Sequence, residues 1–132
     1  MKKQSTIISV AVALIAIGGI WYVMQGSPAP ISSAPSMLDG FTQCLKDKGA
    51  VFYGAFWCPH CQNQKAMFGS SEKLLPYVEC STADGKGQLD VCREKDITGY
   101  PTWTFADGSR ESGELDLVVL GRKTGCELPK TQ

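Results

Sequence analysis

The sequence is short of histidine and has no excess of either charge. One histidine stands among 132 residues, and 13 basic side chains balance 13 acidic ones. A chain with no net charge offers no strong electrostatic attraction to nucleic acid or to an anionic surface. We therefore expect no nucleic-acid partner.

Charge is absent from one long segment near the N-terminus. Between Thr6 and Met24 nearly every residue is apolar and none is charged, over a length close to the roughly 20 residues of a membrane-crossing helix. Because Lys2 and Lys3 precede it, the positive-inside rule sends the following chain across the membrane. We predict a signal anchor, a single transmembrane helix, over residues 1–24. A cleaved signal peptide is the alternative, but its apolar run is usually shorter and no suitable cleavage site follows closely.

The rest of the chain divides into a spacer and one small domain. Residues 25–36 are rich in proline and serine and lack periodicity, which is typical of a linker. Residues 37–132 form one domain and contain all six cysteines. Cysteine-rich small domains are typical of oxidising compartments. We therefore place the domain on the extracytoplasmic side: the periplasm, the cell exterior or the thylakoid lumen.

Hydrophobic spacing predicts alternating helices and strands in this domain. Helices are expected from residue 37 to Gly49, over 59–68, over 88–95 and over 115–123, with a further turn over 71–75. Strands are expected over 50–56, 77–80, 102–105 and 110–112. The order predicts an α/β fold, with helices flanking a small mixed sheet.

The tetrapeptide Cys-Pro-His-Cys at residues 58–61 follows a predicted strand and opens a predicted helix. Its i, i+3 spacing brings the two sulfur atoms to the same side of the first turn. The positive helix end stabilises the thiolate of Cys58, so we predict that Cys58 is an exposed nucleophile. His60 would place a donor or a positive charge beside it. Cys61, one turn inside, would resolve mixed disulfides.

Two other uses of this cysteine pair fit less well. A zinc site needs four ligands, usually in two close pairs, but Cys80 and Cys92 have no close neighbours to make the second pair. A c-type haem needs histidine after the second cysteine, where Gln62 stands instead. We expect no metal and no cofactor.

A second element with chemical meaning surrounds Pro101. A cis Tyr100–Pro101 peptide would expose the Tyr100 backbone to an extended substrate and hold Pro101 against the sulfur atoms. Trp57 and Trp103 could line the same groove, although large aromatic residues beside strands are more often core. Trp57, next to Cys58, is the better candidate for substrate binding.

These segments resemble a known family. Residues 52–69 (FYGAFWCPHCQNQKAMFG), 75–80 (LPYVEC) and 99–105 (GYPTWTF) are similar to the thioredoxin-like domain that is fused to, or accompanies, vitamin K epoxide reductase homologues. The resemblance implies a thioredoxin fold with Cys58 and Cys61 as its active pair and Pro101 as its cis-proline. It also implies a structural disulfide between Cys80 and Cys92. The tetrapeptide alone is also that of the periplasmic oxidase DsbA.

Two features differ from that family or remain open. Thioredoxin and DsbA carry a buried acid six residues before the first active cysteine, and here Phe52 stands at that position, so no proton acceptor for Cys61 is identified. Cys44 and Cys126, on the first helix and after the last, form a third bridge or stay as free thiols. An oxidising compartment favours the bridge.

The sequence supports two classes of function. The first is a thiol–disulfide oxidoreductase whose partners are exported proteins with thiols or disulfides. By the resemblance, it would work as an oxidase recharged by a quinone-linked, vitamin K epoxide reductase-like membrane protein. The second is a non-catalytic binding or assembly module whose cysteines are only structural. The complete Cys-Pro-His-Cys motif at a helix start favours the first.

Overall fold

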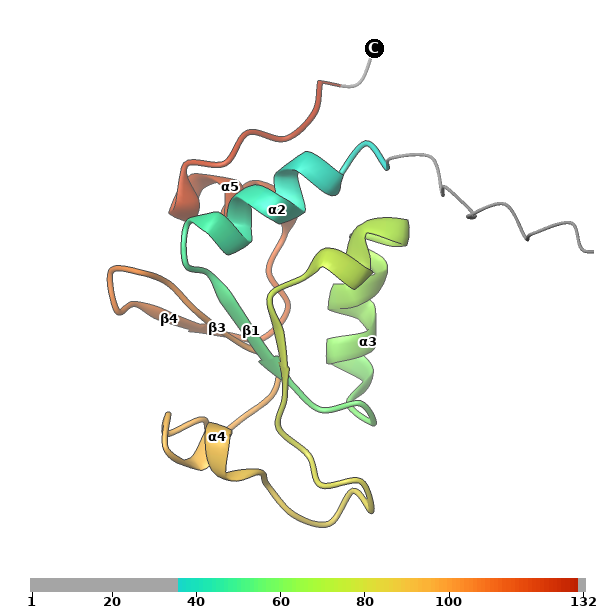
Figure 1. Ribbon diagram of the computed structural model, residues 1–132, viewed down its shortest axis with the longest axis vertical. Coiled ribbons are helices and arrows are strands. Elements are labelled where there is room, and N and C mark those ends of the chain that lie inside the picture. Colours follow the sequence, from blue (N-terminus) through green and yellow to red (C-terminus); the bar gives the residue numbers. More distant parts are fainter. Residues whose placement is uncertain (1–35, 131–132) are drawn as a thin grey trace, which may run out of the picture. The chain divides into compact units, whose positions relative to one another are not determined.

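The computed structural model describes residues 36–130, which form a four-stranded sheet with helices around it (Figure 1). The elements are α2 (Asp39–Asp47), β1 (Val51–Gly54), α3 (Pro59–Ala66), the 3₁₀ helix η1 (Gly69–Leu74), β2 (Tyr77–Glu79), α4 (Asp90–Arg93), β3 (Thr102–Thr104), β4 (Arg110–Ser112) and α5 (Leu117–Thr124). Within these residues, no helix has the length and apolarity needed to span a bilayer. The predicted anchor over 1–24 and the predicted linker up to residue 35 lie outside the described residues.

The sheet is mixed, with strand order β2-β1-β3-β4. β1 runs parallel to β2 and antiparallel to β3, and β4 returns antiparallel to β3. This arrangement confirms the predicted α/β fold with a small mixed sheet. It places β1, the strand that leads into the Cys-Pro-His-Cys motif, in the interior of the sheet.

Helix boundaries follow local chemistry, and α4 and α5 show why some differ from the sequence prediction. The Asp116 carboxylate accepts a hydrogen bond from the backbone N–H of Val118 at 2.8 Å, so α5 begins at Leu117 and not at residue 115. Gly125, in the left-handed region at φ 75°, ends this helix. α4 has four residues where a helix over 88–95 was expected. Asp96, at a positive φ of 51°, turns the chain away soon after it.

The main core is built on a row of three aromatic rings across the sheet. Phe52 on β1 is paired in register with Tyr77 on β2 and with Trp103 on β3. The Phe52 ring lies 5.1 Å from the Tyr77 ring, edge to face, and 4.9 Å from the Trp103 ring, stacked. Such pairs add stability beyond the area that they bury. Phe41 and Leu45 of α2 complete this core from the helix side.

The opposite face of β1 belongs to a smaller cluster. Side chains alternate along a strand, so Tyr53 points away from Phe52 and packs with Cys80, Cys92 and Ile97. Cys80 follows β2 and Cys92 lies on α4, and the two are joined by a disulfide with a Cα–Cα distance of 5.6 Å. The bridge therefore holds α4 against this face of the sheet.

A second disulfide joins the two ends of the domain. Cys44 on α2 is bonded to Cys126, just after α5, with a Cα–Cα distance of 5.9 Å and 82 positions between them in sequence. The two helices also pack together, and they lie side by side in Figure 1. Of the two alternatives that the sequence left open for Cys44 and Cys126, the structure contains the bridge.

We expect the double substitution Cys44→Ala/Cys126→Ala to lower the free energy of unfolding by about 4 kcal/mol, because a cross-link that closes a loop of this length restricts the unfolded chain strongly. Urea unfolding of the variant and the wild-type chain measures the difference. As a control, mass mapping of the non-reduced wild type should find the two cysteine-containing peptides linked. A loss below about 1 kcal/mol, or unlinked peptides, would contradict this assignment.

Candidate redox-active site

The Cys-Pro-His-Cys motif forms the start of α3. Cys58 precedes the helix in an extended conformation at φ −78° and ψ 120°, and Pro59 occupies the first helical turn, where its missing N–H costs nothing. A tight turn brings the chain from β1 into this position, since the Cys58 N–H donates to the Ala55 carbonyl at 3.0 Å. With the other four cysteines in bridges, Cys58 and Cys61 are the two free thiols.

Both sulfur-bearing residues are buried, which differs from the expectation for Cys58. Cys61 is 1% exposed, as its place inside the first turn predicts, but Cys58 is only 6% exposed. The prediction that Cys58 is exposed is therefore wrong. Part of its cover is the segment before β3, where the Cys58 thiol donates to the Tyr100 carbonyl at 3.8 Å.

The Tyr100–Pro101 peptide bond is cis. Pro101 is fully buried, and the Tyr100 carbonyl faces the Cys58 sulfur. The cis-proline segment and the first turn of α3 therefore meet at Cys58.

Burial dominates the electrostatic surroundings of Cys61. Burial raises the pKa of the Cys61 thiol to about 12, and a hydrogen bond with the Cys58 side chain adds to the increase. Lys65, one helical turn further on, acts in the opposite direction through its positive charge. At neutral pH Cys61 is therefore a protonated thiol, so it needs a proton acceptor before it can attack a disulfide.

His60 contacts a carboxylate that the sequence did not indicate. Its Nδ1 atom lies 2.5 Å from the Glu114 carboxylate, and the Asn63 side-chain amide donates to the same oxygen at 3.2 Å. The hydrogen bond from His60 is the largest cause that holds the pKa of Glu114 below its ordinary value. The His60 side chain therefore contacts the loop before α5, which lies 54 positions away in sequence.

Gln64 fixes α3 against the sheet from within the core. Its side chain is polar but fully buried. The amide oxygen accepts from the Trp103 indole N–H at 3.3 Å and from the Leu115 N–H at 2.7 Å, while the amide nitrogen donates to the Leu115 carbonyl at 3.0 Å. A buried polar side chain satisfied in this way holds one geometry. Trp103 is therefore a core residue.

Trp57 lies at the surface, directly before Cys58. It is 49% exposed, and its indole N–H donates to the Ser81 hydroxyl at 2.8 Å. Its ring meets the Tyr100 ring edge to face at 6.1 Å. Phe56, 48% exposed, lies one residue before it. Trp57 and Phe56 form an apolar surface next to Cys58, which we call the aromatic rim.

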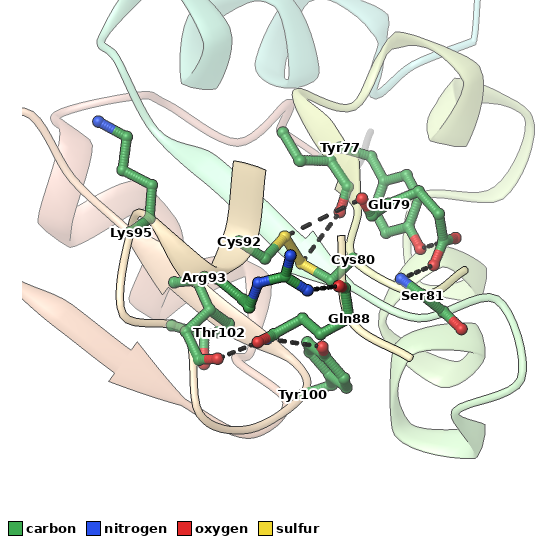
Figure 2. The surroundings of a disulfide bond; sticks show 12 residues. Tyr77, Glu79, Cys80, Ser81, Gln88, Cys92, Arg93, Lys95, Tyr100 and Thr102 are labelled. Carbon is green, nitrogen blue, oxygen red and sulfur yellow. Dashed lines mark hydrogen bonds between the residues drawn. A yellow bond between two sulfur atoms is a disulfide. The ribbon is translucent and has the colours of Figure 1, made fainter. Parts of the chain in front are cut away.

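The Cys80–Cys92 bridge stands behind the Tyr100 side of this rim. Figure 2 shows Gln88 between the disulfide and Tyr100. The Gln88 amide donates to the Tyr100 hydroxyl at 2.9 Å and to the Ile97 carbonyl at 2.6 Å. The disulfide therefore positions the loop whose side chain holds Tyr100.

Four residues near the motif escaped sequence reasoning: Gln64, Glu114, and Tyr77 with Glu79, whose carboxylate accepts a hydrogen bond from the Tyr77 hydroxyl at 2.7 Å. Gln64 and Glu114 make their site contacts across more than 50 positions, and no local pattern announces such contacts. The Tyr77–Glu79 pair had one available signal, since residues i and i+2 of a strand share a face. The shared face points to the motif only when β2 is known to lie beside β1, the strand that leads into the motif.

Comparison with known proteins agrees with this geometry. The sequence model described as thioredoxin matches residues 37–120. The chain is also 42% identical over 101 residues to the thiol-disulfide oxidoreductase LTO1 of Arabidopsis thaliana. That alignment covers 74% of this chain and 26% of the relative, so the chain spans about a quarter of the length of the curated protein that it matches. The fold, the cis-proline and the family match lead to one conclusion: this chain belongs to the thioredoxin family.

Proposed function

We propose that this chain is a thiol–disulfide oxidoreductase that oxidises exported protein thiols through Cys58 and Cys61. The observation that carries the proposal is the division of the six cysteines. Four are used in two bridges, and the remaining two face each other at the start of α3 as free thiols. A pair at that position has the helix-end field and the spacing that disulfide exchange requires.

The proposed oxidation proceeds in two exchanges. A client thiolate attacks the Cys58 sulfur of the Cys58–Cys61 disulfide, the bond between the two sulfur atoms breaks, and Cys61 leaves and takes up a proton. A second client thiolate then attacks the client sulfur of the mixed disulfide, which releases Cys58 as a thiolate. The client gains a disulfide and two electrons remain on the pair.

The aromatic rim and the Tyr100 backbone suit such clients. An unfolded exported protein presents extended backbone and apolar side chains. The cis-proline segment offers main-chain pairing next to Cys58, and the exposed rings of Trp57 and Phe56 offer apolar contact. Tyr100 and Trp57 are therefore proposed to bind the substrate, and Pro101 to shape the reacting edge.

The proposed electron acceptor is a separate vitamin K epoxide reductase-like membrane protein linked to quinone. The support is the resemblance of residues 52–69, 75–80 and 99–105 to the domain that accompanies such proteins. The relative in Arabidopsis thaliana carries the name thiol-disulfide oxidoreductase and is longer than this chain. The two structural bridges suit an extracytoplasmic location, with residues 1–24 as the proposed anchor.

One observation favours a second candidate, a binding or assembly module with no redox turnover. Cys58 is 6% exposed, so a client must reach a sulfur that is nearly covered. Trapping of mixed disulfides separates this candidate from the oxidoreductase.

We expect Cys61→Ser to accumulate mixed disulfides with client proteins and Cys58→Ser to accumulate none. Cys58 makes the bond to the client, and without Cys61 nothing resolves that bond intramolecularly. Non-reducing electrophoresis of the full chain expressed with its export machinery measures the adducts. Equal trapping by both variants would contradict the assignment of roles, and no trapping by either would favour the binding module.

We expect the Cys58–Cys61 couple to be clearly more oxidising than the about −270 mV of thioredoxin, and His60→Ala to make it more reducing. The reason is that a donor or positive charge at His60, within the motif, favours the reduced form of the pair. Equilibration of the full chain with glutathione buffers measures both potentials. Lys46→Ala, which removes a charge from α2 at a distance from the motif, is the control and should leave the potential unchanged. A wild-type potential equal to that of thioredoxin, and unmoved by His60→Ala, would refute the oxidase direction.

A further inference from the structure

Cys61 presents a chemical problem that the family pattern does not solve here. Its pKa of about 12 means that its proton must be removed when it attacks and supplied when it leaves. Phe52 occupies the position of the buried acid and belongs to the aromatic row between Tyr77 and Trp103. A phenyl ring carries no proton, so another group must serve.

Tyr77 is a polar side chain of the sheet that borders the same space as Cys61. Gly54 on β1 lies between them and has no side chain. A carbon placed at its Cβ position would stand 2.9 Å from the Cys61 sulfur and 2.8 Å from Cε2 of Tyr77. The Cys61 sulfur and Cε2, the neighbour of the ring carbon that carries the hydroxyl, therefore both border the space over Gly54.

The Tyr77 hydroxyl is hydrogen-bonded to a carboxylate. It donates to Oε2 of Glu79 at 2.7 Å. The other carboxylate oxygen, Oε1, accepts from the backbone N–H groups of Ser81 at 2.9 Å and Phe56 at 3.2 Å. These bonds hold Glu79 in place with one oxygen directed to the phenol.

The positively charged Lys65 lies beside Tyr77 and Cys61. The Lys65 ammonium lies 3.5 Å from the centre of the Tyr77 ring, and its charge favours the thiolate of Cys61. Two charged or titratable groups near Cys61 come from α3: Cys58 at its start and Lys65 near its end. Two more come from β2: Tyr77, and Glu79 two residues further on. Burial, the hydrogen bond to Glu79 and the charges of Glu79 and the two cysteines raise the pKa of Tyr77 above its ordinary value.

We infer that Tyr77 and Glu79 form a proton relay for Cys61. When Cys61 attacks a mixed disulfide at Cys58, its proton passes to the Tyr77 oxygen while the Tyr77 proton passes to the Glu79 carboxylate. The Cys61–Cys58 bond forms, the bond between Cys58 and the client sulfur breaks, and the client leaves as a thiolate. In the oxidase direction the same relay supplies the proton to Cys61 as it leaves. This inference rests on the proposed function.

A two-step reagent separates the relay from the reactivity of Cys58. Dithionitrobenzoate, an aromatic disulfide, releases one coloured thiolate when Cys58 of the reduced chain attacks it and a second when Cys61 resolves the adduct. We expect Tyr77→Phe and Glu79→Gln to leave the first release unchanged and to slow the second by about 100-fold near neutral pH. The difference in second-release rate between the variants and the wild type should become smaller as the pH rises towards the Cys61 pKa of about 12, because there the thiol ionises without a proton acceptor.

Both variants preserve the local structure, and each has a matched control. Phenylalanine keeps the ring contact with Phe52, and glutamine keeps an oxygen for the two backbone N–H groups. Tyr53→Phe, on the opposite face of β1, and Glu94→Gln, at the end of α4, should leave both releases unchanged.

The possible outcomes are distinct. An unchanged second release in Tyr77→Phe and Glu79→Gln would overturn the relay, and so would a slowing by the same factor at every pH, which indicates a structural effect. The proposed function stands in both cases, because the first release reports on Cys58. Absence of the first release in the wild-type chain would instead refute the proposed function, and the relay with it.

Discussion

The close approach of Cys61 to Gly54 is the contact on which the rest of the site depends. A side chain at Gly54 would collide with the Cys61 sulfur, so glycine lets the first turn of α3 press onto β1. This packing buries Cys61 and raises its pKa. It also gives the two thiols different surroundings, because Cys58 stands at the helix start and next to the Tyr100 carbonyl. The hydrogen bonds of Gln64 keep α3 in this position.

Local chemistry explains which parts of the structure the sequence could predict. The strand–motif–helix order around Cys58 and Cys61, the α/β class and the mixed sheet follow from periodicity and from residues such as Pro59. The ends of α4 and α5 depended on single side-chain and backbone features, such as the cap at Asp116. The exposure of Cys58 could not be predicted, because part of its cover comes from Tyr100, 42 positions away. The same holds for the partner of His60, since Glu114 lies on a distant loop.

The two disulfide bridges restrain different parts of the domain. Cys44–Cys126 closes the ends by joining α2 to the segment after α5, and Cys80–Cys92 fixes the loop and short helix on the other side of the sheet. Gln88 connects this second region to Tyr100, and Ser81 connects it to Trp57. Trp57 and Tyr100 therefore both depend on a segment that the disulfide restrains, which matters in a domain whose small size leaves a narrow stability margin.

The central claim is that packing against β1 makes Cys58 the attacking thiol and keeps Cys61 protonated until it is needed. Timed alkylation of the reduced full chain with iodoacetamide at neutral pH, with each cysteine assigned by mass mapping, tests it most directly. The account predicts that Cys58 is modified faster than Cys61 by about tenfold or more, because the thiolate is the reacting form. Equal rates at the two cysteines, or faster modification of Cys61, would contradict it.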